Sequence, residues 1–241
     1  MALAWLLRGQ RRWGLGRGFW NVNDVREPLR LGLPLGLERF LDGSSFSVMV
    51  LIFARMGDAD LAAPQIVMQL CLVGFLPMLA IGESTGILVG RAVGTGELRL
   101  VTRLTSVGFS LAQVVAVTIA MILWGFRHSL MGLFTSDPAV QSAGRGLLPA
   151  VALVLVMDPG YKIFRATLYG VGDVRAVASG TVALAWLCTP PLTAFFLVYL
   201  GYGALGGWIG LVAEITLGSM WFGYRFARGR WCSGPWPSVN V

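Results

Sequence analysis

The sequence is poor in charge and in the residues that build metal sites and disulfide frameworks. Charged residues make up 13% of the chain, whereas soluble domains carry about a quarter. His128 is the only histidine, and the three cysteines, Cys71, Cys188 and Cys232, are far apart with no Cys-x-x-Cys pair. This pattern argues against a disulfide framework, a zinc site and a histidine-based metal site. Because so little charge cannot cover a water-exposed surface, we predict an integral membrane protein.

Apolar residues make up 56% of the 241 residues, and the mean hydropathy is +0.70. A helix that spans a bilayer needs about 20 mostly apolar residues. Six stretches meet this length, at residues 29–53, 61–89, 104–126, 147–168, 176–200 and 204–226. No charged residue lies between Arg175 and Glu214, a run too long for one span, and Gly201-Tyr202-Gly203 interrupts this run with a turn signal. The expected fold is an all-α membrane protein of about six transmembrane helices.

The net charge of +7 comes from basic residues that recur at alternate connections. They precede the first span, separate the second from the third and follow the last, and we place Lys162, Arg165 and Arg175 at the fourth connection. The opposite side has Arg55 and Arg127, and its fifth connection has no basic residue. The positive-inside rule then predicts a multi-pass protein of the inner (cytoplasmic) membrane with both termini cytoplasmic. This distribution explains the high pI without nucleic-acid binding.

Glycines recur every four residues at Gly82, Gly86, Gly90 and Gly94, so one face of the second span is bare backbone. Such a face lets two membrane helices approach closely. The segment Gly82–Gly86 also matches the Gly-x-Ser-x-Gly pattern of hydrolases, but it lacks the strand-turn-helix context and a nearby histidine. The Gly-x-Gly-x-x-Gly match that begins at Gly201 lacks a preceding strand. We therefore predict no enzyme.

Acidic residues at membrane depth are the informative ones, because a lone charge there costs at least ~2.5–3.5 kcal/mol. Glu38 and Asp42 are four residues apart on one helix face, one turn or more after Pro34. A proline frees a backbone carbonyl, so carbonyl and carboxylate oxygens there can hold Na⁺ or share a proton. In the other interpretation, Arg39 or a base elsewhere neutralises one carboxylate.

Asp158 is followed by Pro159 and, four residues on, by Lys162. An acid four residues before a lysine is typical of a helical ion pair. A proline-interrupted helix that carries an acid is also typical of transporter ion sites. The predicted cation-binding residues are Asp42, Asp158 and Glu38. Residues predicted to serve in a pathway or in packing are Pro34, Glu83, Lys162 and Glu214.

Four segments in register resemble the C-terminal half of MATE transporters. They are Leu31–Leu37, Leu88–Gly94, Leu133–Asp137 and Leu168–Asp173, and the likeness covers roughly residues 28–230. The resemblance implies one lobe of a MATE/MOP-type twelve-helix transporter, which exports organic cations and drugs in exchange for Na⁺ or H⁺. It also places the family's two acids at Asp42 and Asp158. Pro159 and Lys162 depart from the family pattern.

The implied organisation is a basic cytoplasmic linker with the tail of a preceding helix (1–27), a six-helix lobe (28–230) and a cytoplasmic tail (231–241). We expect a truncated transporter, or else a half-transporter that pairs with a second copy. The expected partners are membrane lipid, an organic cation and a missing N-terminal lobe, with no cofactor beyond the coupling ion. Two alternatives are a lipid-linked oligosaccharide flippase, for which only Arg39, Arg145 and Lys162 could line the cavity, and a non-transporting membrane remnant or partner lobe.

Overall fold

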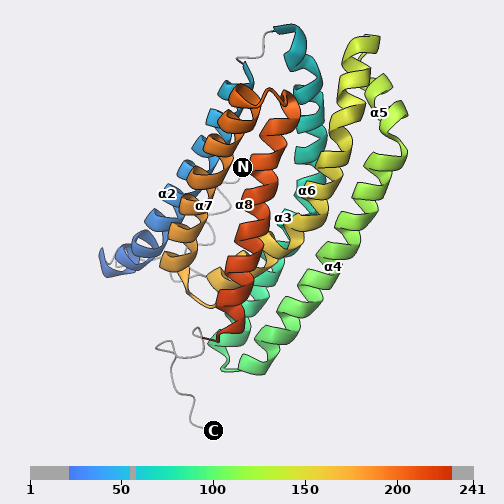
Figure 1. The fold of residues 1–241 in the computed structure, drawn as a ribbon. Helices are drawn as coiled ribbons and strands as arrows, with labels where there is room; N and C mark the ends of the chain where they lie inside the picture. The colour runs from blue at the N-terminus through green and yellow to red at the C-terminus, as the bar shows by residue number, and fades with distance from the viewer. Residues whose placement is uncertain (1–21, 55–57, 230–241) are drawn as a thin grey trace, which may run out of the picture.

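The computed structural model describes residues 22–54 and 58–229, and this part of the chain is helical throughout, without strands (Figure 1). Residues 1–21 of the linker predicted at 1–27 and the tail predicted at 231–241 lie outside the described residues, whereas residues 22–27 belong to the first described helix. The helices in chain order are α2 (Val22–Phe53), α3 (Asp58–Gly94), α4 (Leu98–Gly125), α5 (Arg127–Phe134), α6 (Pro138–Gly170), α7 (Val174–Ala194), the π-helical turn η2 (Phe195–Tyr199) and α8 (Ala204–Ala227). The expected all-α fold is confirmed.

Five of these helices are long and apolar enough to cross a membrane: residues Ala62–Gly94, Leu98–Gly125, Pro138–Gly170, Val174–Leu197 and Ala204–Ala227. The first expected span coincides with α2, a continuous helix of 32 residues. Glu38, Arg39 and Asp42 lie in its middle, so α2 is long enough to span but less apolar than the other five.

The bundle is built around α6, which packs against α3, α4 and α8. In the most apolar 18-residue stretch of α6, 61% of the residues are buried, compared with 28% in the corresponding stretches of α3 and α4. On the other side of the bundle α2 packs along α7, which in turn packs along α8. As a result α2 and α3 stand on opposite sides of the space in front of α6 and α8.

The predicted close approach of a glycine face is confirmed where α3 crosses α6. A Cβ added at Gly86 would lie 2.9 Å from the carbonyl oxygen of Ala166, and one at Gly82 or Gly90 would lie 3.5 Å from a carbonyl oxygen of α6. Gly94 has nothing within 4 Å of such a Cβ, so the tight contact ends at Gly90. The α3–α6 contact thus brings the two backbones together.

The helix ends follow local sequence signals. Asp137 caps α6, because its side chain accepts a hydrogen bond of 2.8 Å from the backbone N–H of Ala139, and Pro138 occupies the first helical position. Gly201 and Gly203 both adopt positive φ, of 67° and 57°, in the predicted turn before α8. The turn predicted at Gly201-Tyr202-Gly203 is confirmed.

Two turns at one end of the bundle have the same construction. The α3–α4 and α6–α7 turns each place a glycine with φ near 80°, Gly96 and Gly172, just past a helix end, and the next N–H reaches back into the helix as in a Schellman motif. Asp173 in the second turn accepts hydrogen bonds of 2.5 and 3.0 Å from Arg225 near the end of α8. This pair holds the end of α8 against the α6–α7 turn.

Candidate functional site

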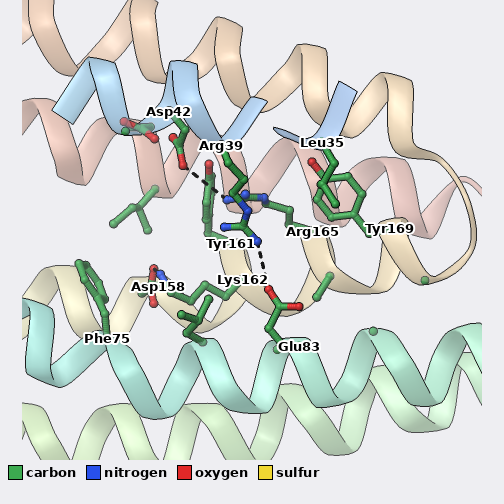
Figure 2. Close-up of a pocket in the computed structure, with 18 of the residues that line it drawn as sticks. Leu35, Arg39, Asp42, Phe75, Glu83, Asp158, Tyr161, Lys162, Arg165 and Tyr169 are labelled. Carbon is green, nitrogen blue, oxygen red and sulfur yellow. Dashed lines mark hydrogen bonds and ion pairs between the residues drawn. The ribbon is translucent and has the colours of Figure 1, made fainter. Parts of the chain in front are cut away.

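A cavity of about 700 Å³ lies in the bundle, with α2 and α3 as facing walls and α6 and α8 behind them (Figure 2). Most of its lining is apolar, and aromatic rings of Phe46, Phe75, Tyr161 and Tyr169 contribute to it. The charged residues that line it are the acids Asp42, Glu83, Asp158 and Glu214 and the bases Arg39, Lys162 and Arg165. The fold therefore brings the sequence-predicted acids of four helices to one cavity.

Glu38 lies beside this cavity and is bound by Arg165. The guanidinium Nη2 of Arg165 donates to Glu38 Oε1 at 2.6 Å, and its Nη1 lies 3.9 Å from Asp42 Oδ2. Glu38 is only 1% exposed, and the side chain of Arg165 is 9% exposed. The guanidinium also lies 5.6 and 5.9 Å from the ring centroids of Tyr161 and Tyr169. A base from α6 thus neutralises the buried acid of α2 and ties the two helices together.

The placement of Lys162 and Arg165 at a flanking connection was wrong. Arg165 is buried inside the bundle, and Lys162 lines the cavity, one turn nearer the middle of α6. Both residues lie within the span predicted at 147–168, and the error arose because charged side chains near a helix end resemble loop charges in sequence. Of the three bases assigned to that connection, only Arg175 follows the end of α6.

The ion pair predicted from the spacing of Asp158 and Lys162 is present. Lys162 Nζ donates to Asp158 Oδ1 at 2.8 Å and lies 4.3 Å from the centre of the Phe75 ring on α3. Asp158 is 1% exposed, and its second oxygen, Oδ2, is buried and accepts no hydrogen bond from the described residues. A lysine thus already occupies one face of the predicted cation ligand Asp158 (Figure 2).

Arg39 and Glu83 connect the two facing walls. Arg39 Nη2 on α2 donates to Glu83 Oε1 on α3 at 3.0 Å, and both side chains are about half exposed. Arg39 Nε also lies 3.9 Å from Glu38 Oε2. Exposed pairs of this kind contribute about 0–1 kcal/mol, so this bridge holds the walls together weakly. Pro34 lies inside α2, half-buried, and is not among the residues that line the cavity.

Among the acids that line the cavity, Asp42 and Glu214 are the two that the neighbouring bases leave most open. Asp42 is 29% exposed, and the nearest basic nitrogen in the described residues is 3.9 Å away on Arg165. Glu214 on α8 is buried and accepts a hydrogen bond from the hydroxyl of Thr189 on α7, with no basic group within 4 Å in residues 22–54 and 58–229. No three His, Cys, Asp or Glu side chains in these ranges are grouped to hold a metal ion.

Sequence reasoning missed four residues of the site: Arg165, Tyr161, Tyr169 and Thr189. The first three recur every four residues along α6 and therefore share one helix face. These residues continue the helix face that begins at Asp158 and Lys162, so their spacing was a usable signal for a polar stripe inside a span. Nothing near Thr189 in the sequence indicates its bond to Glu214, which joins α7 to α8.

The chain matches the MatE family model over residues 34–195. Among curated proteins it is 33% identical over 217 residues to the probable multidrug resistance protein NorM of Deinococcus radiodurans, covering 86% of this chain and 48% of that protein. It is 30% identical over 204 residues to the protein of the same name from Xanthomonas campestris, covering 85% of this chain and 44% of that protein. The chain spans about half the length of these curated relatives.

Solved structures show the same fold at low sequence identity. An outward-facing MATE family multidrug resistance transporter of the MOP superfamily superposes with a TM-score of 0.78 at 18% identity, covering 88% of this chain and 49% of that one. An inward-facing transporter of the same description gives a TM-score of 0.74 at 18% identity, covering 89% and 51%. The six long helices therefore have the fold of one half of such a structure.

Proposed function

Because the chain belongs to the MATE family, we propose that it forms the C-terminal six-helix lobe of a cation-coupled antiporter that exports small organic cations and drugs. The observation that carries the proposal is the charge of the cavity. Four lining carboxylates and the adjacent Glu38 face three bases, Arg39, Lys162 and Arg165. Apolar and aromatic walls with an excess of acid suit an amphipathic organic cation. The names of the curated relatives, multidrug resistance proteins, agree with such a substrate.

The coupling cation, Na⁺ or H⁺, binds in this proposal at Asp42, with Glu38 and Asp158 as the other acids of the site. Asp42 is open to the cavity, and Arg165 approaches it only to 3.9 Å. A cation on Asp42 would weaken the attraction between Asp42 and Arg165, which connects α2 to α6. The cation would therefore stabilise one position of α2 over another, as a ligand that shifts a two-state equilibrium must.

Replacing Asp42 tests this site. In a protein completed by an N-terminal lobe, Asp42→Asn should abolish cation-driven export of ethidium, since the amide keeps the shape but loses the charge. Export is measured from cells, and in inverted vesicles under an imposed Na⁺ or H⁺ gradient, which also identifies the coupling ion. Glu97→Gln is the matched control, because Glu97 is an exposed acid outside the cavity. Unchanged export by the Asp42 variant at equal protein abundance would overturn the assignment.

In the proposed orientation the protein lies in the inner membrane, and both of its termini are in the cytoplasm. The α3–α4 turn, the α6–α7 turn and the end of α8 lie at one end of the bundle (Figure 1). Exposed arginines gather there, at Arg91, Arg99, Arg103, Arg175 and Arg228, whereas Arg127 lies at the other end. By the positive-inside rule the arginine-rich end faces the cytoplasm.

A lipid-linked oligosaccharide flippase agrees less well with the cavity. An anionic lipid substrate requires bases that are free to bind it, and each cavity base already has an acid within 3.0 Å. Arg145 does not line the cavity and bonds instead to Gln141 on its own helix. The cavity charge thus favours export of cations over that of anionic lipids.

A further inference from the structure

The only lysine of the chain, Lys162, points into the cavity instead of lying at the membrane surface. Its Nζ lies between two groups from different helices, 2.8 Å from Asp158 Oδ1 on α6 and 4.3 Å from the Phe75 ring centre on α3 (Figure 2). A carboxylate and an aromatic face are the pair of groups with which proteins bind organic ammonium ions. The lysine ammonium therefore sits where the ammonium group of a substrate would be bound.

The surroundings of this pair do not resemble a purely structural ion pair. Burying two charges is costly, and apolar residues of similar size often stabilise a fold equally well. Asp158 is nonetheless 1% exposed, and its Oδ2 accepts no hydrogen bond from the described residues, so one side of the carboxylate is unused. The Lys162 side chain is 18% exposed, toward the cavity. Its ammonium lies at the end of a flexible stem and can move relative to Asp158.

We propose that Lys162 is a built-in cation that occupies one cation position of the cavity, between Asp158 and Phe75, and thereby determines the charge of the substrates that the cavity accepts. The inference rests on the proposed function, because it concerns the same cavity. With Lys162 in place, one carboxylate fewer is available to a bound cation. The cavity therefore favours monocations over dications, and loss of the lysine charge opens a second position.

The test measures binding of two probes, the monocation tetraphenylphosphonium and the dication methyl viologen, to the purified full chain in lipid nanodiscs. Because the Coulomb energy of a bound cation scales with its charge, Lys162→Met should raise the affinity about tenfold for the monocation and about a hundredfold for the dication. Lys162→Arg should keep the wild-type ratio of the two affinities. Arg145→Met is the matched control, since it removes a base of α6 outside the cavity and should change neither affinity.

Asp158→Asn should change the two affinities in the opposite direction, and this test does not depend on whether the Lys162 variant folds. It leaves the Lys162 charge in the cavity without its partner, so both affinities should fall, the dication's more steeply. In the double variant Lys162→Met with Asp158→Asn the ratio should return close to the wild-type value. A lysine with a purely structural role would change the melting temperature in these variants without changing the ratio.

Two negative outcomes are distinguishable. If the wild type binds tetraphenylphosphonium but the ratio of the two affinities is the same in Lys162→Met, Asp158→Asn and wild type, the role of Lys162 is overturned and the proposed function stands. If neither probe binds to any of the proteins, the cation-accepting cavity fails, and the role of Lys162 fails with it. A rise in dication affinity confined to Lys162→Met supports both proposals.

Discussion

At the scale of single residues, the pair of Arg165 and Glu38 is the most consequential contact of the site. Arg165→Met should destabilise the protein by about 3–5 kcal/mol, because it leaves the Glu38 carboxylate, 1% exposed, without its partner. The measurement is unfolding of the purified protein in detergent, followed by circular dichroism against denaturant. The same loss should loosen α2, which has few other contacts with the helices around α6.

The matched variant removes both charges together. Arg165→Met with Glu38→Leu should recover most of the lost stability, because a buried pair replaced by apolar residues leaves no unpaired charge. The two single effects are thus strongly non-additive, as expected for groups in direct contact. Additive losses in the double variant would contradict a direct pairing of the two side chains in the folded protein.

At this scale, sequence reasoning identified the charged residues of the site better than it identified the residues with which they form ion pairs. The Asp158–Lys162 pair was predicted because its members are four residues apart on one helix, where geometry is local. The Arg165–Glu38 pair joins residues 127 positions apart, and no local pattern says that α2 lies against that part of α6. Whether Asp42, Asp158 and Glu38 bind a cation stays a prediction.

At the scale of elements, local rules predicted the helices and several of their ends. A proline after Asp137 and the glycines around Tyr202 mark boundaries that the structure has. The predicted start of the fourth span, residue 147, was nine residues late, since α6 begins at Pro138. Hydropathy locates the apolar middle of a helix, whereas α6 extends through polar residues that its cap and its contact with α5 support.

The α3–α6 crossing offers a prediction with a control on the same helix. Gly86→Ala should cost about 1–3 kcal/mol, because its Cβ would lie 2.9 Å from the Ala166 carbonyl oxygen and force two backbones apart. Gly94→Ala, with nothing within 4 Å, should be neutral or slightly stabilising. Both are measured as melting temperatures in one detergent. Equal melting temperatures for the two variants would mean that the helices are not in backbone contact at Gly86.

At the scale of the whole molecule, the chain corresponds to about half of its relatives, both in sequence and in structure. The family resemblance in sequence already predicted a single lobe of a larger transporter, and the coverage agrees with it. The cavity lies between α2 and α3, which do not pack closely against each other. Within the described residues, the weak Arg39–Glu83 bridge is the only ion pair or hydrogen bond seen to join these two walls. The proposed transport pathway therefore needs a further surface to complete it.

A second lobe should supply that surface. We expect co-expression of this chain with the N-terminal six-helix half of the Deinococcus radiodurans relative to give ethidium efflux, and expression of either half alone to give none. Efflux is followed by fluorescence, and affinity purification of one tagged half should recover the other. The Asp42→Asn chain in the same pairing controls for leakage.

Efflux from this chain alone, with cross-linked copies of it in the membrane, would instead identify a half-transporter that completes its cavity with a second copy. Titration of Asp42→Asn into the wild type separates the two arrangements. A homodimer that needs Asp42 in both copies should retain activity as the square of the wild-type fraction, whereas a lobe paired with a different partner should retain activity in direct proportion to that fraction.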